Sequence, residues 1–347
     1  KTVNTLRLWS AAATDAFNLN EFNAGSYSEA VAAKNNAEHI SMVLYPNDSS
    51  ENGKELRLRQ QYFLASASLK DIMQIWEQSE GPDWDNFTDK NVFQMNDTHP
   101  AIAVAELMRL LMDEKGLEWD RAWEITSSCM AYTNHTLLPE ALEKWPVALL
   151  GRLLPRLLEI IYEINARFLG EVSLHRLGGP EMLHRVSIIE EGLVKQVRMA
   201  HLAIAGSFSV NGVAALHSKL LCENLFNDFY NIWPEKFNNK TNGVTPRRWI
   251  VHANPGRTGL LNDSIGDGWT SDLSGISALA AHADAADEDF FSRWEAIKLA
   301  NKQRLAWLVQ ETTGVEFDTG ALFSVQVKRI HEYKRQLLNL LHVIHLY

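Results

Sequence analysis

Apolar residues recur at spacings of three and four along most of the chain, a pattern that predicts amphipathic helices. Two shorter runs, 92–100 and 321–330, look like strands that end in polar clusters and lead into a helix. A third run, "TVNTLRLWS" at 2–10, alternates like a buried strand. Helices that alternate with strands predict an α/β fold, whose ligands bind at the carboxyl ends of parallel strands. The predicted helices cover 27–44, 54–76, 100–116, 118–132, 140–169 and 290–314.

The strand predicted at 321–330 ends in a cationic segment, and a helix is expected to run on from Tyr333. The whole chain is acidic, with a formal net charge of -10, so the mutual repulsion of these cations calls for a local anion. Arginine offers a bidentate fork and lysine a point charge, which together suit a phosphate. A solvated basic face paired with Glu332 is the alternative, and spacing alone leaves both open. The segment contains Lys328, Arg329, His331, Lys334 and Arg335.

Two polar clusters that each contain a histidine, "MNDTHP" at 95–100 and "AYTNHTLLPE" at 131–140, directly follow apolar runs. Their Asn, Asp, Thr and His side chains combine donors and acceptors, as sugar hydroxyls require. Helix capping is the competing explanation, with Asp97 or Thr98 capping a helix at Pro100. Capping is favoured for either cluster alone, whereas two histidine clusters at strand ends favour a pocket.

Two further segments are ambiguous at this level. "SVNGVA" places Asn211 at the expected start of a helix, where an N-cap role is favoured. "YPNDSSENGKE" at 45–55 predicts an exposed loop that carries Asp48 and is suited to gating a site. Gly, Ser and Asn interrupt the helical pattern within 204–218, which makes this stretch a candidate lobe boundary.

Composition limits the class of protein. A chain of 347 residues exceeds the roughly 250 to 300 at which single cores usually stop growing, so more than one lobe is expected. The acidic charge argues against nonspecific nucleic-acid binding, and every apolar run is interrupted before the roughly 20 residues that span a bilayer. Cys129 and Cys222 lie in apolar helical patterns and favour a reducing cytoplasm over a disulfide framework. The sequence contains no Walker loop, zinc-protease helix or nucleophile elbow, and no metal site is predicted.

Long runs of the chain resemble the α-glucan phosphorylases, the family of glycogen, starch and maltodextrin phosphorylases. They include "LYPND", "NDTHPAIAVAELMR", "AYTNHTLLPEALEKWP", "MAHLAIAGSFSVNGVAALHS" and "VQVKRIHEYKRQLLN". The resemblance extends from end to end and weakens only between about residues 256 and 320. It implies the GT-B fold, in which two Rossmann-like lobes face each other across a cleft. Residues 1–209 would be the last part of the first lobe, and 210–347 the first part of the second, cofactor-binding lobe.

The resemblance also implies a reaction. Members of this family carry out phosphorolysis, in which orthophosphate cleaves the terminal α-1,4 bond of a glucan and releases glucose 1-phosphate with retained configuration. Pyridoxal phosphate is the implied cofactor, and its phosphate group is the proton relay beside the substrate phosphate. Two adjacent phosphates repel unless several cations share their charge, which would account for the cationic segment. Lys328, Arg329 and Lys334 resemble the family's phosphate-binding catalytic cations, and Lys328 and Tyr333 resemble its cofactor neighbours.

The remaining site residues are implied in the same way. His135 and Asn211 resemble contacts to the terminal glucose, with His135 also placed where charge develops on the leaving sugar, and Tyr333 resembles a neighbour of the sugar. Asp97 and His99 resemble residues on the acceptor side of the cleft. Asp48 resembles the aspartate of the gate loop, although Ser49 stands where the animal enzymes have an asparagine, which puts gate-type regulation in doubt.

The resemblance further implies that the chain is a central segment of a longer enzyme. The family's Schiff-base lysine would lie beyond Tyr347, so the isolated chain is expected to be inactive. Residues 23–41 resemble a helix that packs across the family dimer, so the full-length protein is expected to be a cytoplasmic homodimer. Two other functions stay open: a GT-B glycosyltransferase that uses a sugar nucleotide, and a non-catalytic glucan-binding relative.

Overall fold

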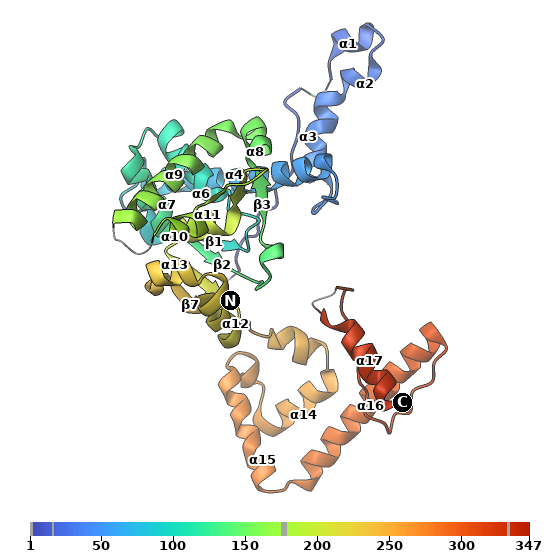
Figure 1. Ribbon diagram of the computed structural model, residues 1–347. Helices are drawn as coiled ribbons and strands as arrows, with labels where there is room; N and C mark the ends of the chain where they lie inside the picture. The colour runs from blue at the N-terminus through green and yellow to red at the C-terminus, as the bar shows by residue number, and fades with distance from the viewer. Residues whose placement is uncertain (1–2, 16, 175–178, 332–333) are drawn as a thin grey trace. The chain divides into compact units, whose positions relative to one another are not determined.

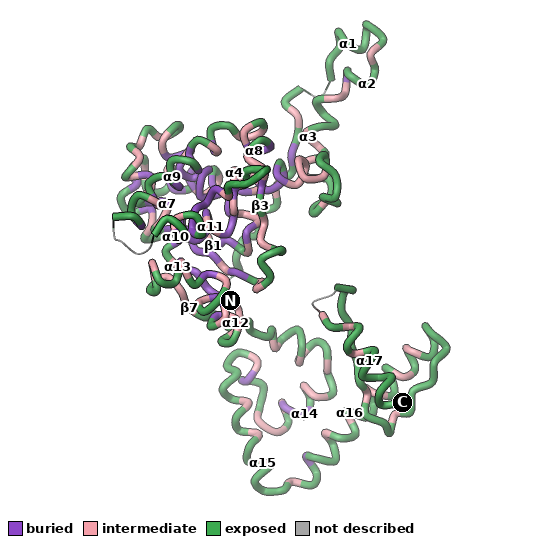
Figure 2. Tube along the Cα trace, viewed as in Figure 1, coloured by how far each residue is buried: buried purple, intermediate pink, exposed green. Residues whose placement is uncertain are grey.

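The computed structural model describes residues 3–15, 17–174, 179–331 and 334–347 (Figure 1). The chain forms two compact units, Lys1–Asn242 and Gly243–Tyr347. Most buried side chains belong to the first unit, whereas the second is exposed along most of its length (Figure 2). The main hydrophobic core therefore belongs to the first unit.

A four-stranded parallel sheet lies in the first unit. Its strands are β1 (Phe93–Asn96), β2 (Met130–Thr133), β6 (Ser209–Gly212) and β7 (Phe237–Asn239), in the order β1-β2-β6-β7. All three neighbouring pairs are parallel, so the four carboxyl ends lie at the same edge of the sheet. The predicted α/β fold with a parallel sheet is confirmed.

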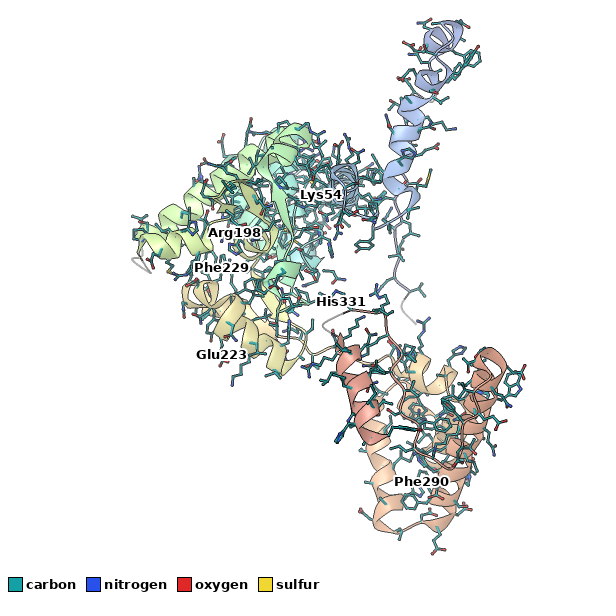
Figure 3. The ribbon with its side chains drawn as sticks, turned by 45° about the vertical axis from the view of Figure 1, so that its right-hand side comes forward. Lys54, Arg198, Glu223, Phe229, Phe290 and His331 are labelled. Atoms are coloured by element: carbon teal, nitrogen blue, oxygen red, sulfur yellow. The ribbon has the colours of Figure 1, made fainter. Side chains whose placement is uncertain are left out.

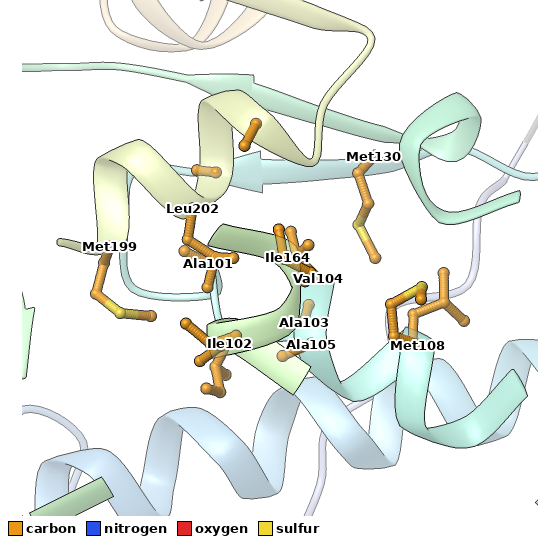
Figure 4. Close-up of a cluster of buried hydrophobic side chains, with 14 of the residues drawn as sticks. Ala101, Ile102, Ala103, Val104, Ala105, Met108, Met130, Ile164, Met199 and Leu202 are labelled. Carbon is orange, nitrogen blue, oxygen red and sulfur yellow. The ribbon is translucent and has the colours of Figure 1, made fainter. Parts of the chain in front are cut away.

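Helices pack on this sheet through buried apolar faces. The helix α6 (Ala103–Arg109) contacts α4 (Glu51–Glu80), α7 (Trp119–Cys129) and α9 (Pro155–Leu174). Figure 4 shows the small side chains Ala103 and Ala105 on α6, with Ile164 of α9 close to Val104 and Leu202 of α11 (Met199–Ala205) close to Ala101. Small side chains on α6 leave room for larger ones on its neighbours, as a closely packed core requires.

Two predicted helices are interrupted. The stretch 118–132 is helical only to Cys129, and its last residues form β2 because their side chains are buried on both faces of the sheet. The stretch 140–169 contains β3 (Lys144–Pro146), α8 (Val147–Leu153) and then α9, which opens on Pro155. Proline fits the first turn of a helix but restricts the residue before it, so α8 ends before Leu154.

A second, antiparallel sheet lies beside the first. β3 pairs with β5 (Gln196–Arg198), and β5 pairs with β4 (Ile189–Glu190). The other helical segments of the first unit are α1 (Leu19–Asn23), α2 (Tyr27–Ala30), α3 (Ala32–Met42), α5 (Phe87–Lys90), η1 (Leu110–Glu114), η2 (Pro139–Ala141), α10 (Pro180–Val186), α12 (Ala215–Leu220), η3 (Leu221–Leu225), α13 (Asn227–Ile232) and η4 (Pro234–Lys236).

The second unit is helical throughout its regular segments. The long helix α16 (Glu288–Thr313) packs on α14 (Pro255–Ile265), and Phe290 is one of its buried residues (Figure 3). The other segments are η5 (Arg247–His252), η6 (Gly268–Thr270), η7 (Leu273–Leu279), α15 (Ala280–Asp284) and α17 (Gln336–Leu346).

Two predicted strands are wrong. In the N-terminal run, Leu6 and Leu8 are 83% and 85% exposed and the described residues form no strand. In the run 321–330, Val327 and Ile330 are 87% and 95% exposed, again without strand pairing. A strand needs a neighbouring strand for its backbone groups, and the described residues of the second unit contain none. An apolar alternation cannot form a strand without that partner.

Three other sequence predictions bear on this fold. β6 crosses the lobe boundary predicted after residue 209 and pairs with β7 in the first unit, and the boundary between Rossmann-like lobes stays a prediction. Cys129 is buried, Cys222 is partly buried, and neither forms a disulfide. Among the described residues, no helix is long and apolar enough to cross a membrane.

Candidate functional site

Polar residues gather where the parallel strands of the first unit end. Asp97 directly follows β1, and Asn134 and His135 follow β2. Asn211 lies within β6 beside the end of β2, since it is in register with Thr133. Two of the predicted clusters are therefore neighbours at one edge of the sheet.

Asp97 occupies a turn that its own side chain stabilises. Its φ is +65°, in the left-handed region that Asn and Asp tolerate best. Its N–H donates to the Thr133 carbonyl at 3.0 Å, and its carboxylate accepts from the Thr98 N–H at 2.8 Å. The predicted cap at Pro100 is wrong in detail, because α6 begins at Ala103 and Asp97 caps only the preceding turn.

A row of side-chain hydrogen bonds crosses β1, β2 and β6. Gln94 donates to the Thr133 hydroxyl at 2.8 Å, and that hydroxyl donates to the Asn211 Oδ1 at 2.9 Å. The Asn211 Nδ2 donates to the Gly212 carbonyl at 2.9 Å. The predicted N-cap role of Asn211 is wrong, because Asn211 lies in β6 and α12 begins only at Ala215. Both ends of its amide bond to protein atoms.

Asn134 fixes the turn that presents His135. Its side chain is fully buried, donates to the Tyr132 hydroxyl at 3.1 Å and accepts from the Thr136 N–H at 3.0 Å. The next side chain, His135, is exposed. Burial lowers the pKa of the nearby His217, and the charge of His135 lowers it further. A neutral His217 limits positive charge beside His135.

Asp48 and His99 belong to one polar cluster, which we call the Arg57 cluster: Asp48, Arg57, His99 and Glu143. Arg57 on α4 donates to Asp48 at 2.7 Å, and its Nε lies 3.4 Å from the Glu143 Oε1. The His99 Nδ1 lies 3.5 Å from the Arg57 Nη2 and 3.9 Å from the Glu143 Oε1. The interaction with Glu143 raises the pKa of His99, against the opposing effect of burial.

Sequence reasoning missed Arg57 and Glu143. Arg57 lies in the helix predicted at 54–76 and Glu143 in the run "AYTNHTLLPEALEKWP", but a charged residue in a helical pattern is usually a solvated one. Only the structure shows that Arg57 lies on the same helix as the buried polar residues Gln60 and Gln61. The Glu143 Oε2 and Arg57 Nε are buried without a hydrogen-bond partner among the described residues.

A groove adjoins the Arg57 cluster and runs along β1. Its volume is about 530 Å³. Polar groups from α4 and from the end of β1 face a largely apolar floor, an arrangement suited to a small organic ligand. The polar residues that line it are Arg57, Gln60, Gln61, Ser68, Gln94, Asn96 and His99, with Tyr45 at the same site.

The predicted phosphate-binding cations belong to the second unit. Lys328 and Arg329 lie on an exposed segment before α17, near His331 in Figure 3. Gln336 in the first turn of α17 donates to the carbonyls of Lys328 and Arg329 at 3.4 and 3.1 Å. Lys334 precedes α17, which begins at Gln336 and not at Tyr333 as predicted, and Tyr333 lies outside the described residues. Among the ion pairs between described residues, none involves Lys328 or Arg329.

The described residues contain no group of three or more His, Cys, Asp or Glu side chains that could hold a metal ion. Lys328 and Arg329 supply amine and guanidinium donors on a segment whose backbone Gln336 holds at two points. Their type and spacing fit a phosphate group.

Comparison with known proteins gives a consistent result over the whole chain. The family model for carbohydrate phosphorylases matches residues 1–347. A glycogen phosphorylase from Synechocystis is 54% identical over 346 residues, which is 100% of this chain and 40% of that protein. The muscle forms of glycogen phosphorylase from Oryctolagus cuniculus and Homo sapiens are 52% and 51% identical over 352 residues, 99% of this chain and 42% of theirs. The chain thus spans about 40% of the length of these relatives, and it belongs to the carbohydrate phosphorylase family.

Proposed function

We propose that the protein at its natural length is an α-1,4-glucan phosphorylase, which releases glucose 1-phosphate from glycogen or maltodextrin with orthophosphate. The observation that carries this proposal is the identity above 50% to proteins named glycogen phosphorylase, sustained over the whole chain. The polar edge of the parallel sheet supports it, because hydroxyl-rich ligands need mixed donors and acceptors at a strand end.

The proposed architecture is the GT-B fold. The parallel sheet of the first unit is the kind of sheet a Rossmann-like lobe contains. The second unit would begin the other lobe, which holds the cofactor. The predicted division at 209/210 remains part of this proposal, although the sheet of the first unit continues to Asn239 at the end of β7.

Lys328, Arg329 and Lys334 would bind the phosphates, and Lys328 and Tyr333 would be neighbours of the cofactor. Each cation lowers the energy of a nearby dianion, and two adjacent phosphates need several such charges at once. Pyridoxal phosphate, when bound, would supply a phosphate group that exchanges a proton with the substrate phosphate. The cations would hold the orthophosphate oxygens so that one of them is oriented toward the glycosidic carbon.

The residues of the first unit would bind the sugar. His135, exposed at the end of β2, would hydrogen-bond the terminal glucose near the bond that breaks. Asn211 would border the same glucose, and Asp97 and His99 would bind the acceptor side of the glucan. Asp48, held by Arg57, would lie on the loop that closes the site. A homodimer through 23–41 and a cytoplasmic location complete the proposal, and free thiols at Cys129 and Cys222 fit a reducing compartment.

The test is release of glucose 1-phosphate from a malto-oligosaccharide by the protein at its natural length, supplied with orthophosphate and pyridoxal phosphate. Arg329→Ala should lower kcat/KM by about 100-fold or more, because it removes a cation from a phosphate in the transition state. Arg304→Ala is the matched control, since Arg304 is an exposed arginine on α16 in the same unit. Turnover of a nucleotide sugar without cofactor would favour the glycosyltransferase, and glucan binding without any turnover would favour a binding protein.

A further inference from the structure

The Arg57 cluster joins three parts of the chain that are far apart in the sequence. Arg57 lies on α4 about one turn after Lys54, which Figure 3 labels. It holds Asp48 on the loop 43–50, which connects α3 to α4. His99 follows β1, and Glu143 precedes β3, where the Met199 N–H donates to its carbonyl at 3.1 Å. The backbone of Glu143 is therefore fixed by the antiparallel sheet, and its carboxylate reaches from that fixed point into the cluster.

Three nitrogen atoms lie near one oxygen of that carboxylate, and one of them donates a hydrogen bond to it. The Glu143 Oε1 accepts from the Gln61 Nε2 at 2.8 Å and lies 3.4 Å from the Arg57 Nε and 3.9 Å from the His99 Nδ1. The Glu143 side chain is only 11% exposed and that of Arg57 is 21% exposed, so water screens this interaction weakly. The Arg57 guanidinium also lies 5.8 Å from the centre of the Tyr45 ring, and the Gln60 Nε2 donates to the Val43 carbonyl at 2.7 Å.

We infer that Glu143 is a positioning residue: by holding Arg57 and His99 with one carboxylate, it fixes the Asp48 loop against the sheet edge. Without that carboxylate, Arg57 keeps Asp48 as its one strong acceptor, and Asp48 is 52% exposed on a loop. The guanidinium then loses its fixed direction and the loop loses its anchor. The effect on a sugar ligand rests on the proposed function, whereas the effect on the loop does not.

The protonation of His99 decides which member of the Arg57 cluster its Nδ1 can bond. A neutral ring can accept at Nδ1 from the Arg57 Nη2, but a protonated ring carries a hydrogen there and can only donate, toward Glu143. The charge of His99 therefore decides which partner it bonds. The groups that face it are Glu143 before β3, Asp97 after β1, Arg57 on α4 and the Tyr45 ring of the loop, which meets it edge-on at 5.7 Å.

The test is hydrogen–deuterium exchange of the peptide that covers 43–50, in the protein at its natural length and in Glu143→Gln. Glutamine has nearly the same shape and still accepts from Gln61, so the fold should survive. We expect exchange in this peptide to rise about fivefold or more, with the core peptides of α6 and β2 unchanged. Glu190→Gln is the matched control: Glu190 pairs with Lys144, next to Glu143, at 2.9 Å and is not a member of the Arg57 cluster. Unchanged exchange in Glu143→Gln, or an equal rise in the control, would overturn the inference.

A second variant guards against a local folding defect. Arg57→Gln should loosen the same peptide, and the double variant should be no looser than Arg57→Gln alone, because both changes break one linkage. In the phosphorylase assay, Glu143→Gln should raise the KM for malto-oligosaccharide about five- to tenfold with kcat within about twofold. The acidic side of the variant's pH–activity profile should move to lower pH, because Glu143 no longer raises the pKa of His99. A wild-type protein without phosphorylase activity would refute the proposed function and leave the exchange result to decide the role of Glu143.

Discussion

Gly206 lies in a position that a methyl group cannot enter. It follows α11 and immediately precedes the segment that becomes β6, and it is buried. A Cβ at this position would lie 2.5 Å from the Val104 Cγ1 and 2.9 Å from its Cγ2. The φ of Gly206 is -85°, which alanine adopts without strain, so the obstacle is the packed valine of α6 and not the backbone.

The cost of Gly206→Ala can be estimated from that overlap. Forcing a methyl group into a filled core typically costs about 1 to 3 kcal/mol. Val104→Ala alone removes two methyl groups from a fully buried side chain, which costs about 2 kcal/mol. In the double variant the new methyl group takes space that the valine vacated. We therefore expect the double variant to be destabilised by about 2 kcal/mol, less than the sum of the single changes.

The assay is urea unfolding followed by circular dichroism for the wild type, both single variants and the double variant. Gly170→Ala is the control, since a Cβ at Gly170 on α9 meets no atom within 4 Å and alanine should stabilise that helix by about 0.5 to 1 kcal/mol. Strictly additive free energies of unfolding, or a Gly206→Ala protein as stable as the wild type, would refute the packing argument. Because β6 carries Asn211, the same shift should also weaken ligand binding at the sheet edge.

Three other predictions concern buried polar groups. The His201 Nδ1 lies 3.0 Å from the Ser187 carbonyl oxygen, and burial lowers the pKa of His201 to about 4. In the unfolded chain this histidine has its ordinary pKa near 6.5, so as the pH falls the unfolded chain is protonated before the folded one. Stability should therefore fall by up to about 3 kcal/mol between pH 6.5 and 4, and urea midpoints of His201→Gln should lack that part of the slope. Asn165→Leu leaves the buried Ile188 N–H without its acceptor at 2.7 Å and should cost about 1 to 3 kcal/mol in urea unfolding. Glu106→Leu removes the fully buried partner of Arg109, which keeps only the more exposed Glu114, and it leaves the Ser66 hydroxyl without its acceptor. It should cost about 3 kcal/mol and lower the melting temperature by several degrees.

The sequence predicted what depends on local pattern. The polar clusters of Asp97 and His135 were placed at strand ends because their apolar runs are short and are followed by turn-forming residues. The helix predicted at 118–132 was wrong at its end. Large side chains such as Met130 and Tyr132 fit the apolar pattern of a buried strand as well as that of a helix, and periodicity alone cannot separate the two. Arg57 and Glu143 were missed because they are 86 positions apart in the sequence, and a long-range contact of that kind produces no local sequence pattern.

The residues at the sheet edge form two groups: those whose hydrogen-bonding groups are already used within the protein, and those that can still bond a ligand. Asn134 and Asn211 bond to protein atoms at both ends of their amides, so in this arrangement they shape the edge more than they contact a ligand. The exposed imidazole of His135 and the half-buried ring of His99 retain capacity, and the carboxylate of Asp97 has one oxygen beyond the one that Thr98 uses. If the proposed function holds, discrimination among sugars at this edge should depend on the residues that follow the strands. Substitution of His135 should change ligand preference, whereas substitution of Asn134 should change stability.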